Sequence, residues 1–295
     1  MTTTESTAKS PPERRVQEMQ VVVAQTRRDT PDTTTLFFAS DEPFDYKAGH
    51  FCTIDPHQFS QLEHFTAYLE DLKGQQEKPR AYSLASAPHE PHVAITIKEE
   101  RYHSGETPYP PLLSPLLTYH TPVGSTMTIK GFTGAYTLSD DVTNQTDNIV
   151  HMCAGSGSVP NLGIIKDSLH RGDALKHTLL YSNKTREDII YYYEFEDLHR
   201  QYPDKFDVIH CITRQDPTGI RNARQGRISP ELLSEVIPDP TNTFVFTCGP
   251  GITPHERKAA KEKGEEPTPR FTENMVEMLR QHGLDKKQIK QESWG

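Results

Sequence analysis

The pattern of secondary structure expected along this 295-residue chain changes halfway, and this change constrains the fold more than any other feature. Short segments rich in Val, Ile, Thr and Phe, separated by turn formers, fill the first half and predict β-strands. The second half alternates strand-like and helical segments, which is typical of a parallel sheet with helices on both faces. We therefore expect two domains: an antiparallel β-barrel followed by an α/β domain with a parallel sheet.

The expected elements of each half follow from these periodicities. In the first half, we expect strands at residues 19–26, 34–39, 50–55, 80–85, 92–98 and 126–130. In the second half, we expect strands at 148–154, 177–182, 206–213 and 243–248, helices at 159–169, 188–202, 230–236 and 272–282, and a short strand at the end of the chain.

Several stretches interrupt the two patterns. Residues 58–78 are polar and partly helical in pattern, which indicates an insertion, and the Pro-rich stretch 102–111 predicts a loop. Residues 251–269 mix Lys and Glu and predict a mobile surface loop. We place the linker at 139–147, between a first domain at 18–141 and a second at 145–295. Residues 1–17 lack an apolar core, so we expect a disordered tail and no secretory signal.

Charge and cysteine usage exclude several classes of protein. The net charge of −9 argues against nonspecific binding to nucleic acid or anionic lipid, and the chain contains no apolar run long enough to cross a bilayer. Its four cysteines form no C-x-x-C pair, which excludes a zinc ribbon and a plant-type two-iron cluster. The histidines do not group at ligand spacing. We therefore expect no metal site, and a cytoplasmic protein with free thiols.

The first motif is Arg80-Ala81-Tyr82-Ser83, within the sequence RAYSLAS. Along a strand, Arg80 and Tyr82 point one way and Ser83 the other. A guanidinium that pairs with phosphate oxygens and a ring that lies along a flat ligand suit a phosphate beside a large ring system. The alternative is an ordinary strand with a surface arginine.

The second motif, Gly155-Ser156-Gly157-Ser158-Val159-Pro160, lies between the first strand and the first helix of the α/β domain. An open parallel sheet binds a dinucleotide at this place, where glycines let the backbone approach a pyrophosphate and the helix N-terminus offers free N–H groups. Pro160 suits a first helical turn. The third glycine of the usual fingerprint is absent, so a plain glycine turn remains the alternative.

The third motif, Cys248-Gly249-Pro250-Gly251, ends a later strand at the same edge of the sheet. A small polarisable thiol at this edge could contact a nicotinamide. A buried cysteine before a turn is the alternative.

Together and in this order, the three motifs resemble the ferredoxin–NADP reductase superfamily of flavoproteins, and the resemblance covers residues 18–295. Members of this superfamily pair a flavin-binding barrel with a nicotinamide-binding α/β domain. The resemblance implies that Arg80 binds a flavin phosphate, that Tyr82 stacks beside the isoalloxazine, and that Ser83 hydrogen-bonds near the flavin N5. Ala81 lies between them in the same site.

The resemblance extends to three further flavin contacts. Ser86, three residues past Ser83, is similar to the FAD-type members, which favours FAD over FMN. Lys98 corresponds to the end of a strand whose backbone lines the flavin. Ser114 fits the G-x-x-S element that opens a short helix under the pyrophosphate, as an N-cap before a proline, although Pro111 replaces the glycine.

The C-terminus, Glu292-Ser293-Trp294-Gly295, is similar to the Glu-x-aromatic end of many members of this superfamily. The resemblance implies that Trp294 covers the flavin face on which nicotinamide must stack and that Glu292 polarises the hydride site. We expect Ser83, Cys248 and Glu292 to be the catalytic residues. A frayed hydrophilic tail is the alternative.

The NAD(P) site is expected to use the glycine turn, the Cys248-Gly249-Pro250 segment and the end of the second α/β strand. The segment from Ser182 to Ile189, which includes Asn183, resembles the NADH-dependent cytochrome b reductases, in which an acid at the position of Asp188 disfavours a 2′-phosphate. Lys184 and Arg186 argue for NADPH, because both could pair with a phosphate. We favour NADH. Helix capping and solvated charge are the alternative roles of these residues.

The resemblance implies a flavin-dependent NAD(P)H oxidoreductase that passes electrons through FAD to a separate one-electron acceptor. The acceptor is expected to be a ferredoxin, an oxygenase component or a cytochrome, and we expect the reductase to be a monomer. A non-catalytic flavin- or nucleotide-binding subunit of a larger complex is one alternative. An NAD-dependent dehydrogenase without flavin is another, although the barrel-like first half argues against it.

Overall fold

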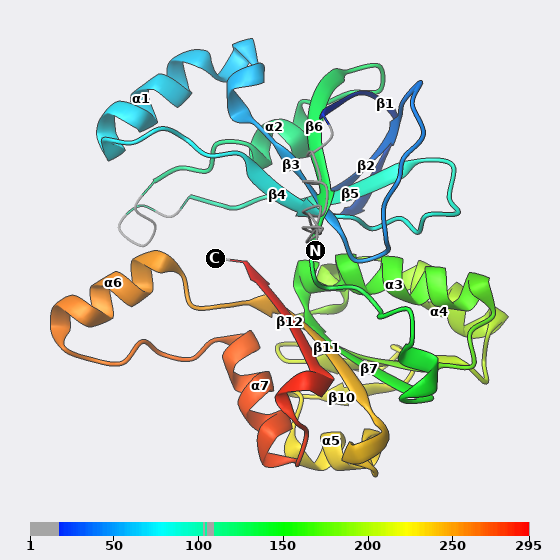
Figure 1. Ribbon diagram of the computed structural model, residues 1–295. Coiled ribbons are helices and arrows are strands. Elements are labelled where there is room, and N and C mark those ends of the chain that lie inside the picture. The colour runs from blue at the N-terminus through cyan, green and yellow to red at the C-terminus, as the bar shows by residue number, and fades with distance from the viewer. Residues whose placement is uncertain (1–17, 103, 105–108, 295) are drawn as a thin grey trace, which may run out of the picture.

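The computed structural model describes residues 18–102, 104 and 109–294, which form the two predicted domains (Figure 1). The predicted tail and half of the predicted loop at 102–111 lie outside the described residues.

The first domain is a six-stranded antiparallel sheet with the strand order β4-β3-β6-β1-β2-β5. The two edge strands approach each other where Leu84 bridges Ile95, so the sheet curls towards the predicted barrel. Val23, Leu36 and Ile129 are buried in its interior because alternate residues of each strand face inwards. The strands are β1 (Glu18–Thr30), β2 (Thr33–Ala39), β3 (Phe51–Ile54), β4 (Arg80–Ser83), β5 (Val93–Lys98) and β6 (Thr126–Thr133).

The second domain is a six-stranded parallel sheet with the order β10-β9-β8-β7-β11-β12. The predicted parallel α/β architecture is therefore confirmed. Strand β10 was not predicted, because its three residues show no apolar alternation that would mark a strand in the sequence. The strands are β7 (Asn148–Ala154), β8 (Lys176–Asn183), β9 (Phe206–Ile212), β10 (Ala223–Gln225), β11 (Phe244–Pro250) and β12 (Ile289–Trp294).

Helices cover both faces of the parallel sheet. Apolar residues of α3 (Ser158–Arg171) and α4 (Tyr192–Gln201) pack on one face, and those of α5 (Pro230–Val236) and α7 (Phe271–Gln281) pack on the other. The barrel domain carries α1 (Glu63–Lys73) and α2 (Ser114–Tyr119). Short 3-10 turns occupy Pro56–Gln58, Ser60–Leu62, Val142–Asn144, Gly155–Gly157, Arg186–Asp188, Pro240–Asn242 and Lys286–Gln288.

The prediction of a loop over residues 251–269 was wrong, because α6 (Pro254–Lys263) lies within it. Thr253 and Glu256 form a capping box at its start, and Gly264 ends it in the left-handed conformation. These end signals are present in the sequence, but the apolar stripe that usually identifies a helix is missing. The helix expected from residue 188 begins only at Tyr192, after a 3-10 turn.

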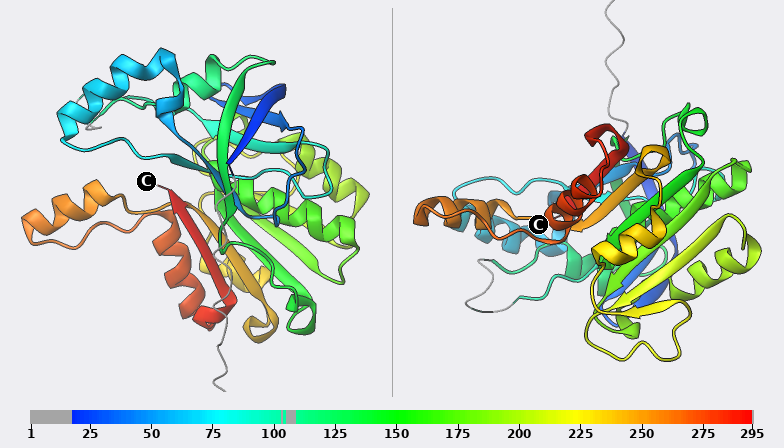
Figure 2. Two further views of the ribbon diagram at one scale, coloured as in Figure 1. Left: turned by 45° about the horizontal axis from the view of Figure 1, so that its top comes forward. Right: turned by 90° about the horizontal axis from the view of Figure 1, so that it is seen from below.

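The two domains pack directly against each other. Phe37, Ala85 and Ala94 of the barrel join the apolar cluster under α3 and α4. On one side of the molecule, α1 and α6 project outwards from different domains, and the C-terminal strand β12 ends between them (Figures 1 and 2). The insertion predicted at 58–78 and the segment 251–269 therefore flank the end of the chain.

Candidate active site

The three predicted catalytic residues come together where the barrel meets the end of β12. The Ser83 hydroxyl, at the end of β4, donates a hydrogen bond of 3.2 Å to Glu292 Oε2. Glu292 pairs in register with Cys248 on the neighbouring strand β11. We name this group the Ser83–Cys248–Glu292 cluster.

Burial favours the neutral forms of the two ionisable groups in this cluster, Cys248 and Glu292. Desolvation raises the pKa of Glu292, and the hydrogen bond from Ser83 offsets only part of that increase. Burial, followed by the nearby carboxylate of Glu292, raises the pKa of Cys248 well above its usual value. The thiol of Cys248 is therefore a neutral, polarisable group at neutral pH, not a nucleophilic thiolate.

The glycine turn packs against this cluster. Gly155–Gly157 form a 3-10 turn, and α3 begins at Ser158. A Cβ atom on Gly157 would lie 2.0 Å from the carbonyl oxygen of Cys248 and 3.0 Å from Cη2 of Trp294. Only glycine fits at this position, which brings the second and third motifs and the C-terminal aromatic residue into contact.

A buried hydrogen-bonded network supports the turn from below. Asn161 Nδ2 donates to the Gly157 carbonyl at 2.7 Å, and Asn161 Oδ1 accepts from Tyr136 Oη at 3.0 Å. His151 Nδ1 lies 2.7 Å from the same Oδ1 atom, and His151 Nε2 lies 3.0 Å from His177 Nδ1. We did not predict this network, because no motif marks its residues.

Both histidines of the network are fully buried, and desolvation lowers the pKa of each. The pKa of His151 falls to about 4, so its ring is neutral at neutral pH. Because Asn161 Oδ1 can only accept, His151 carries its proton on Nδ1 and accepts from His177 at Nε2. His177 Nε2 then accepts from the hydroxyl of Ser168 at 2.9 Å. Every polar atom in this chain of contacts has a complementary partner.

The Cys248-Gly249-Pro250 segment is fixed by α7 and β12. A Cβ atom on Gly249 would lie 2.3 Å from the ring of Phe271, and Thr272 Oγ1 donates to the Gly249 carbonyl at 3.1 Å. Pro250 pairs with Trp294 across the two strands. The Trp294 side of the site is therefore built on a rigid support.

At the other end of β4, Arg80 forms an ion pair with Glu77 and donates to the carbonyl of Lys78. The side chain of Arg80 is 39% exposed, and two of its five N–H groups bond to the described residues, which leaves three without a partner among those residues. Tyr82 packs on the barrel interior, where burial raises its pKa, and Ala81 is exposed.

The side chains of three residues predicted to contact the flavin have partners within the protein, and the capping role predicted for one of them, Ser114, was wrong. The Ser86 hydroxyl is buried and accepts hydrogen bonds from Tyr46 Oη and from the backbone N–H of Ala94, both at 2.9 Å, so it is not available to a ligand. Ser114 is not an N-cap. The cap residue is Leu113, and the Ser114 hydroxyl accepts from the Glu100 N–H at 3.1 Å. Lys98 Nζ pairs with Asp32 at 2.8 Å, which leaves only its backbone for the predicted role.

The segment predicted to select the coenzyme follows β8. Asp188 Oδ2 accepts hydrogen bonds from the N–H and the hydroxyl of Thr185 in a capping box. This carboxylate oxygen therefore has the helix-capping role that was the alternative to coenzyme selection. The guanidinium of Arg186 lies 5.1 Å from the centre of the Tyr192 ring. Asn183 is buried, and the carbonyl of Lys184 accepts from the N–H of Arg214 at 2.8 Å. Asp188 and Arg186 lie close in the chain but are held by different partners.

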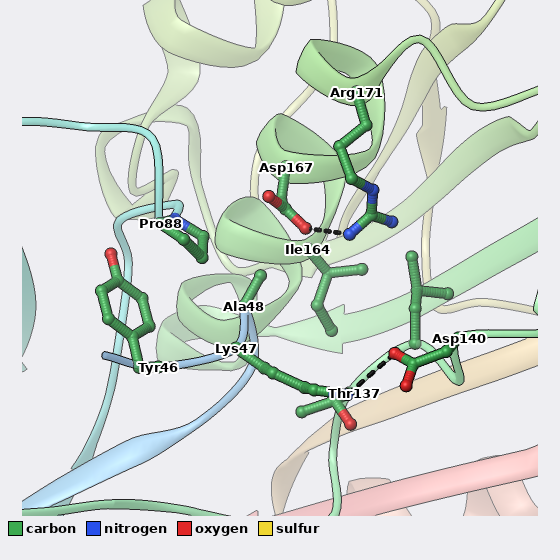
Figure 3. A pocket seen from close by; sticks show the side chains of 10 residues that line it. Tyr46, Lys47, Ala48, Pro88, Thr137, Asp140, Ile164, Asp167 and Arg171 are labelled. Atoms are coloured by element: carbon green, nitrogen blue, oxygen red, sulfur yellow. Dashed lines mark hydrogen bonds and ion pairs between the residues drawn. The ribbon is translucent and has the colours of Figure 1, made fainter. Parts of the chain in front are cut away.

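A separate pocket of about 250 Å³ lies at the seam between the domains (Figure 3). Barrel residues, the start of the linker and α3 line it. Its charged side chains pair with one another: Lys47 with Asp140 at 2.8 Å, and Arg171 with Asp167. Because these charges cancel locally, we assign no charged ligand to this pocket.

The residues present fit a dinucleotide flavin beside a nicotinamide nucleotide. Gly157 leaves no room for a side chain beside Cys248 and Trp294, and Glu292 is a half-buried carboxyl group hydrogen-bonded to Ser83. Arg80 keeps donors that no described residue uses, and these could bind a phosphate. Among the described residues, no group of three or more His, Cys, Asp or Glu side chains could hold a metal ion. In the same residues, no helix has the length and apolar character that crossing a membrane requires.

Comparisons with known proteins agree with this geometry. A family model described as the oxidoreductase NAD-binding domain matches residues 152–255. NADH-cytochrome b5 reductase 2 of Coccidioides immitis is 29% identical over 242 residues, which are 80% of this chain and 69% of that relative. The ferredoxin reductase component of 3-ketosteroid-9-alpha-monooxygenase from Mycobacterium tuberculosis is 29% identical over 173 residues, 58% of this chain and 42% of that protein.

Solved structures share the whole fold. The flavohem-like FAD/NAD binding domain of nitric oxide dioxygenase from Vibrio cholerae superposes with a TM-score of 0.68 at 18% identity, covering 94% of this chain and 98% of that chain. Ferredoxin-NADP+ reductase from Plasmodium falciparum gives a TM-score of 0.63 at 15% identity, covering 94% of this chain and 96% of that one.

The chain therefore has the two-domain fold of the FAD/NAD binding domain from Vibrio cholerae, and its α/β domain contains the match to the oxidoreductase NAD-binding domain. The predicted resemblance to the ferredoxin–NADP reductase superfamily agrees with the matched NAD-binding domain, with the NADH-cytochrome b5 reductase relatives and with the shared fold. The predicted enzyme class and cofactors, an FAD-dependent reductase that uses NADH or NADPH, agree with the same comparisons.

Proposed function

We propose that this protein oxidises a reduced nicotinamide nucleotide and delivers the electrons, through bound FAD, to a separate one-electron acceptor. The observation that carries this proposal is the hydrogen bond between Ser83 and Glu292, which joins the barrel to the C-terminal strand beside Cys248. A hydroxyl, a thiol and a carboxyl group from three distant parts of the chain meet there, next to the glycine turn.

FAD supplies the redox chemistry when it is bound, because a flavin accepts two electrons at once and can release them singly. The protein's own residues bind and orient the reactants. Arg80 offers free donors to a phosphate, and the turn at Gly157 lets the backbone approach a pyrophosphate. The Ser83–Cys248–Glu292 cluster excludes water from the place where the nicotinamide would react.

Trp294 also has a role in the proposed function. It is the only tryptophan, it is 37% exposed, and it lies at the end of β12 against the Gly157 turn. We assign it the role of covering the flavin until the nicotinamide ring takes its place. The neutral thiol of Cys248 then contacts the incoming ring without competing as a nucleophile.

We propose NADH as the coenzyme. The Asp188 carboxylate is fixed at the C-terminal end of β8 by its capping bonds, and a fixed negative charge there would repel a 2′-phosphate. The Arg186 guanidinium is engaged with Tyr192, which reduces its availability to a phosphate. The fungal relatives are named NADH-dependent enzymes, in agreement with this choice.

The acceptor is proposed to be a cytochrome, a ferredoxin or an oxygenase component, as the names of the relatives indicate. The matched regions cover 69% and 64% of the first two fungal relatives. We further propose that the reductase acts as a monomer in the cytoplasm.

The test is the visible spectrum of the purified protein with FAD, before and after anaerobic addition of NADH, followed by turnover with ferricyanide. We expect bound flavin that is bleached by NADH and turnover that exceeds the rate with NADPH. Bound flavin without turnover would favour the non-catalytic subunit. A protein that stays colourless with added FAD would favour a dehydrogenase without flavin and refute the proposal.

A further inference from the structure

The insertion that contains α1 brings a carboxylate and a second cation to Arg80. Glu77 precedes β4, and its side chain is only 4% exposed. Its carboxylate accepts hydrogen bonds from Lys73, the last residue of α1, and from Arg80. We name these three residues the Lys73–Glu77–Arg80 cluster. Two cations and one carboxylate give it a formal charge of +1.

The cluster is held rigidly in place. The backbone N–H of Glu77 donates to Glu70 Oε1 at 2.8 Å, so Glu77 is tied to α1 by its main chain as well as by its carboxylate. Lys73 Nζ lies 4.6 Å from the centre of the Tyr109 ring, and the Lys73 side chain is 16% exposed. Glu77 therefore cannot withdraw from Arg80 without breaking several contacts at once.

Glu77 is charged at neutral pH. Burial alone would raise its pKa, but the hydrogen bonds from Lys73 and Arg80 outweigh desolvation and lower it. An anion that binds Arg80 consequently meets a fixed negative charge on the far side of the same guanidinium. Such an anion can bind at the exposed side of Arg80, where three N–H groups have no partner in the part of the chain that the structure describes.

We propose that Glu77 makes this site select a flavin whose phosphates carry one negative charge each over a flavin whose phosphate carries two. This inference rests on the proposed function. Each phosphate of a dinucleotide pyrophosphate carries a single charge, whereas a terminal phosphomonoester carries about −1.5 to −2 at pH 7. The cluster's charge of +1 matches the single charge of a pyrophosphate group, and the fixed carboxylate of Glu77 repels the additional charge of a phosphomonoester.

The test measures dissociation constants for FAD and for FMN by the quenching of flavin fluorescence, on protein stripped of flavin and at one ionic strength. Glu77→Gln keeps the shape and one of the two acceptor oxygens but removes the charge. We expect this variant to improve the affinity for FMN relative to FAD by about five- to tenfold. Glu63→Gln is the matched control, because Glu63 is an exposed acid at the start of the same helix.

Each outcome separates the inference from the proposed function. An unchanged ratio of the two dissociation constants in Glu77→Gln, or an equal gain for both flavins, overturns the inference while flavin binding itself survives. A wild-type protein that binds neither flavin refutes the proposed function and the inference together. Arg80→Met should weaken the binding of both flavins. If this variant bound FAD and FMN as tightly as the wild-type protein does, the Lys73–Glu77–Arg80 cluster would not be part of the flavin site.

Discussion

At the scale of single residues, Gly157 has the least room for a side chain among the glycines of the proposed active site, because a Cβ atom there would lie 2.0 Å from the Cys248 carbonyl oxygen. Because Gly157 has no side chain, the carbonyl of Cys248 can pack against its backbone, in space that a Cβ atom would need. Gly155 differs, because it has a positive φ of 51°, and no atom of the described residues would lie within 4 Å of a Cβ atom at this position. One glycine is required by space and the other by conformation.

We therefore expect Gly157→Ala to cost more than Gly155→Ala. The first substitution forces a methyl group into a backbone carbonyl and should destabilise the protein by about 2–3 kcal/mol. The second should cost about 1 kcal/mol, which is typical of the left-handed conformation in a non-glycine residue. Urea denaturation of both variants measures the difference, and equal losses would contradict the packing of the turn against Cys248.

Asp188 carries two functions in the same carboxylate, a cap and a proposed charge barrier. Asp188→Asn keeps an oxygen that can accept from Thr185 but removes the charge. We expect the ratio of kcat/KM for NADPH to that for NADH to rise about fivefold, with the free energy of unfolding changed by less than about 0.5 kcal/mol. Steady-state kinetics with both coenzymes, together with denaturation, test this. An unaltered coenzyme ratio would leave Asp188 with the cap alone.

At the scale of elements, the buried histidines connect β7, β8 and α3. The pKa values of His151 and His177 are lower in the folded protein than in the unfolded chain. The unfolded state therefore binds more protons between about pH 6.5 and the folded pKa values, so stability is present above that range and is lost as the pH falls through it. For His151 the lower limit is about pH 4.

Replacing His151 should reduce this dependence on pH. His151→Phe removes one titrating group, leaves His177 Nδ1 without its acceptor and removes one of the two donors to Asn161 Oδ1, which should cost about 2–4 kcal/mol at pH 7. Between pH 7 and pH 5 the variant should lose less stability than the wild type. Denaturation curves at several pH values measure both effects, and parallel pH profiles would show that folding does not lower the pKa of His151.

The sequence predicted most elements because their apolar periodicity is strong. β7 and α5 were placed at their observed bounds, since a continuous apolar run and a Pro residue after a capping serine mark their limits. α6 was missed because its residues are nearly all polar, so only its caps could identify it. The capping role of Ser114 was wrong, because Glu100 competes for the hydroxyl through a contact that local sequence does not reveal.

The residues of the site likewise divide into those that the sequence predicted and those that it did not. The motifs at Arg80, Gly157 and Cys248 were visible because each combines a chemical group with a position in a strand or turn. Glu77 and Asn161 were not, since a lone acid in an insertion and a lone amide in a helix have no distinguishing pattern. Their roles arise from tertiary contacts with Arg80 and with the Gly157 carbonyl.

At the scale of the whole molecule, the position of one domain on the other decides whether the active site exists. Ser83 belongs to the barrel, whereas Cys248 and Glu292 belong to the α/β domain. The seam beside them is set by α3, where a Cβ atom on Gly163 would lie 3.0 Å from the carbonyl of Ser86 and 3.2 Å from that of Leu84. α3 thus rests almost directly on the backbone that follows β4.

Enlarging Gly163 should therefore separate the domains at the place where hydride transfer is proposed. Gly163→Ala requires a shift of a few tenths of an ångström, whereas Gly163→Val cannot fit without moving α3 away from the barrel. Since Ser83 is bonded to Leu84 in the chain, this shift should lengthen the contact with Glu292, and a misplacement of about 1 Å can cost a hundredfold in turnover.

The measurement is turnover of NADH with ferricyanide, alongside circular dichroism and flavin binding. We expect Gly163→Ala to retain most of its activity and Gly163→Val to lose about tenfold or more while each domain keeps its secondary structure. Loss of flavin binding in the valine variant would point to damage within the barrel instead. Full activity in Gly163→Val would show that the contact between Ser83 and Glu292 does not depend on the close approach of α3 to the barrel.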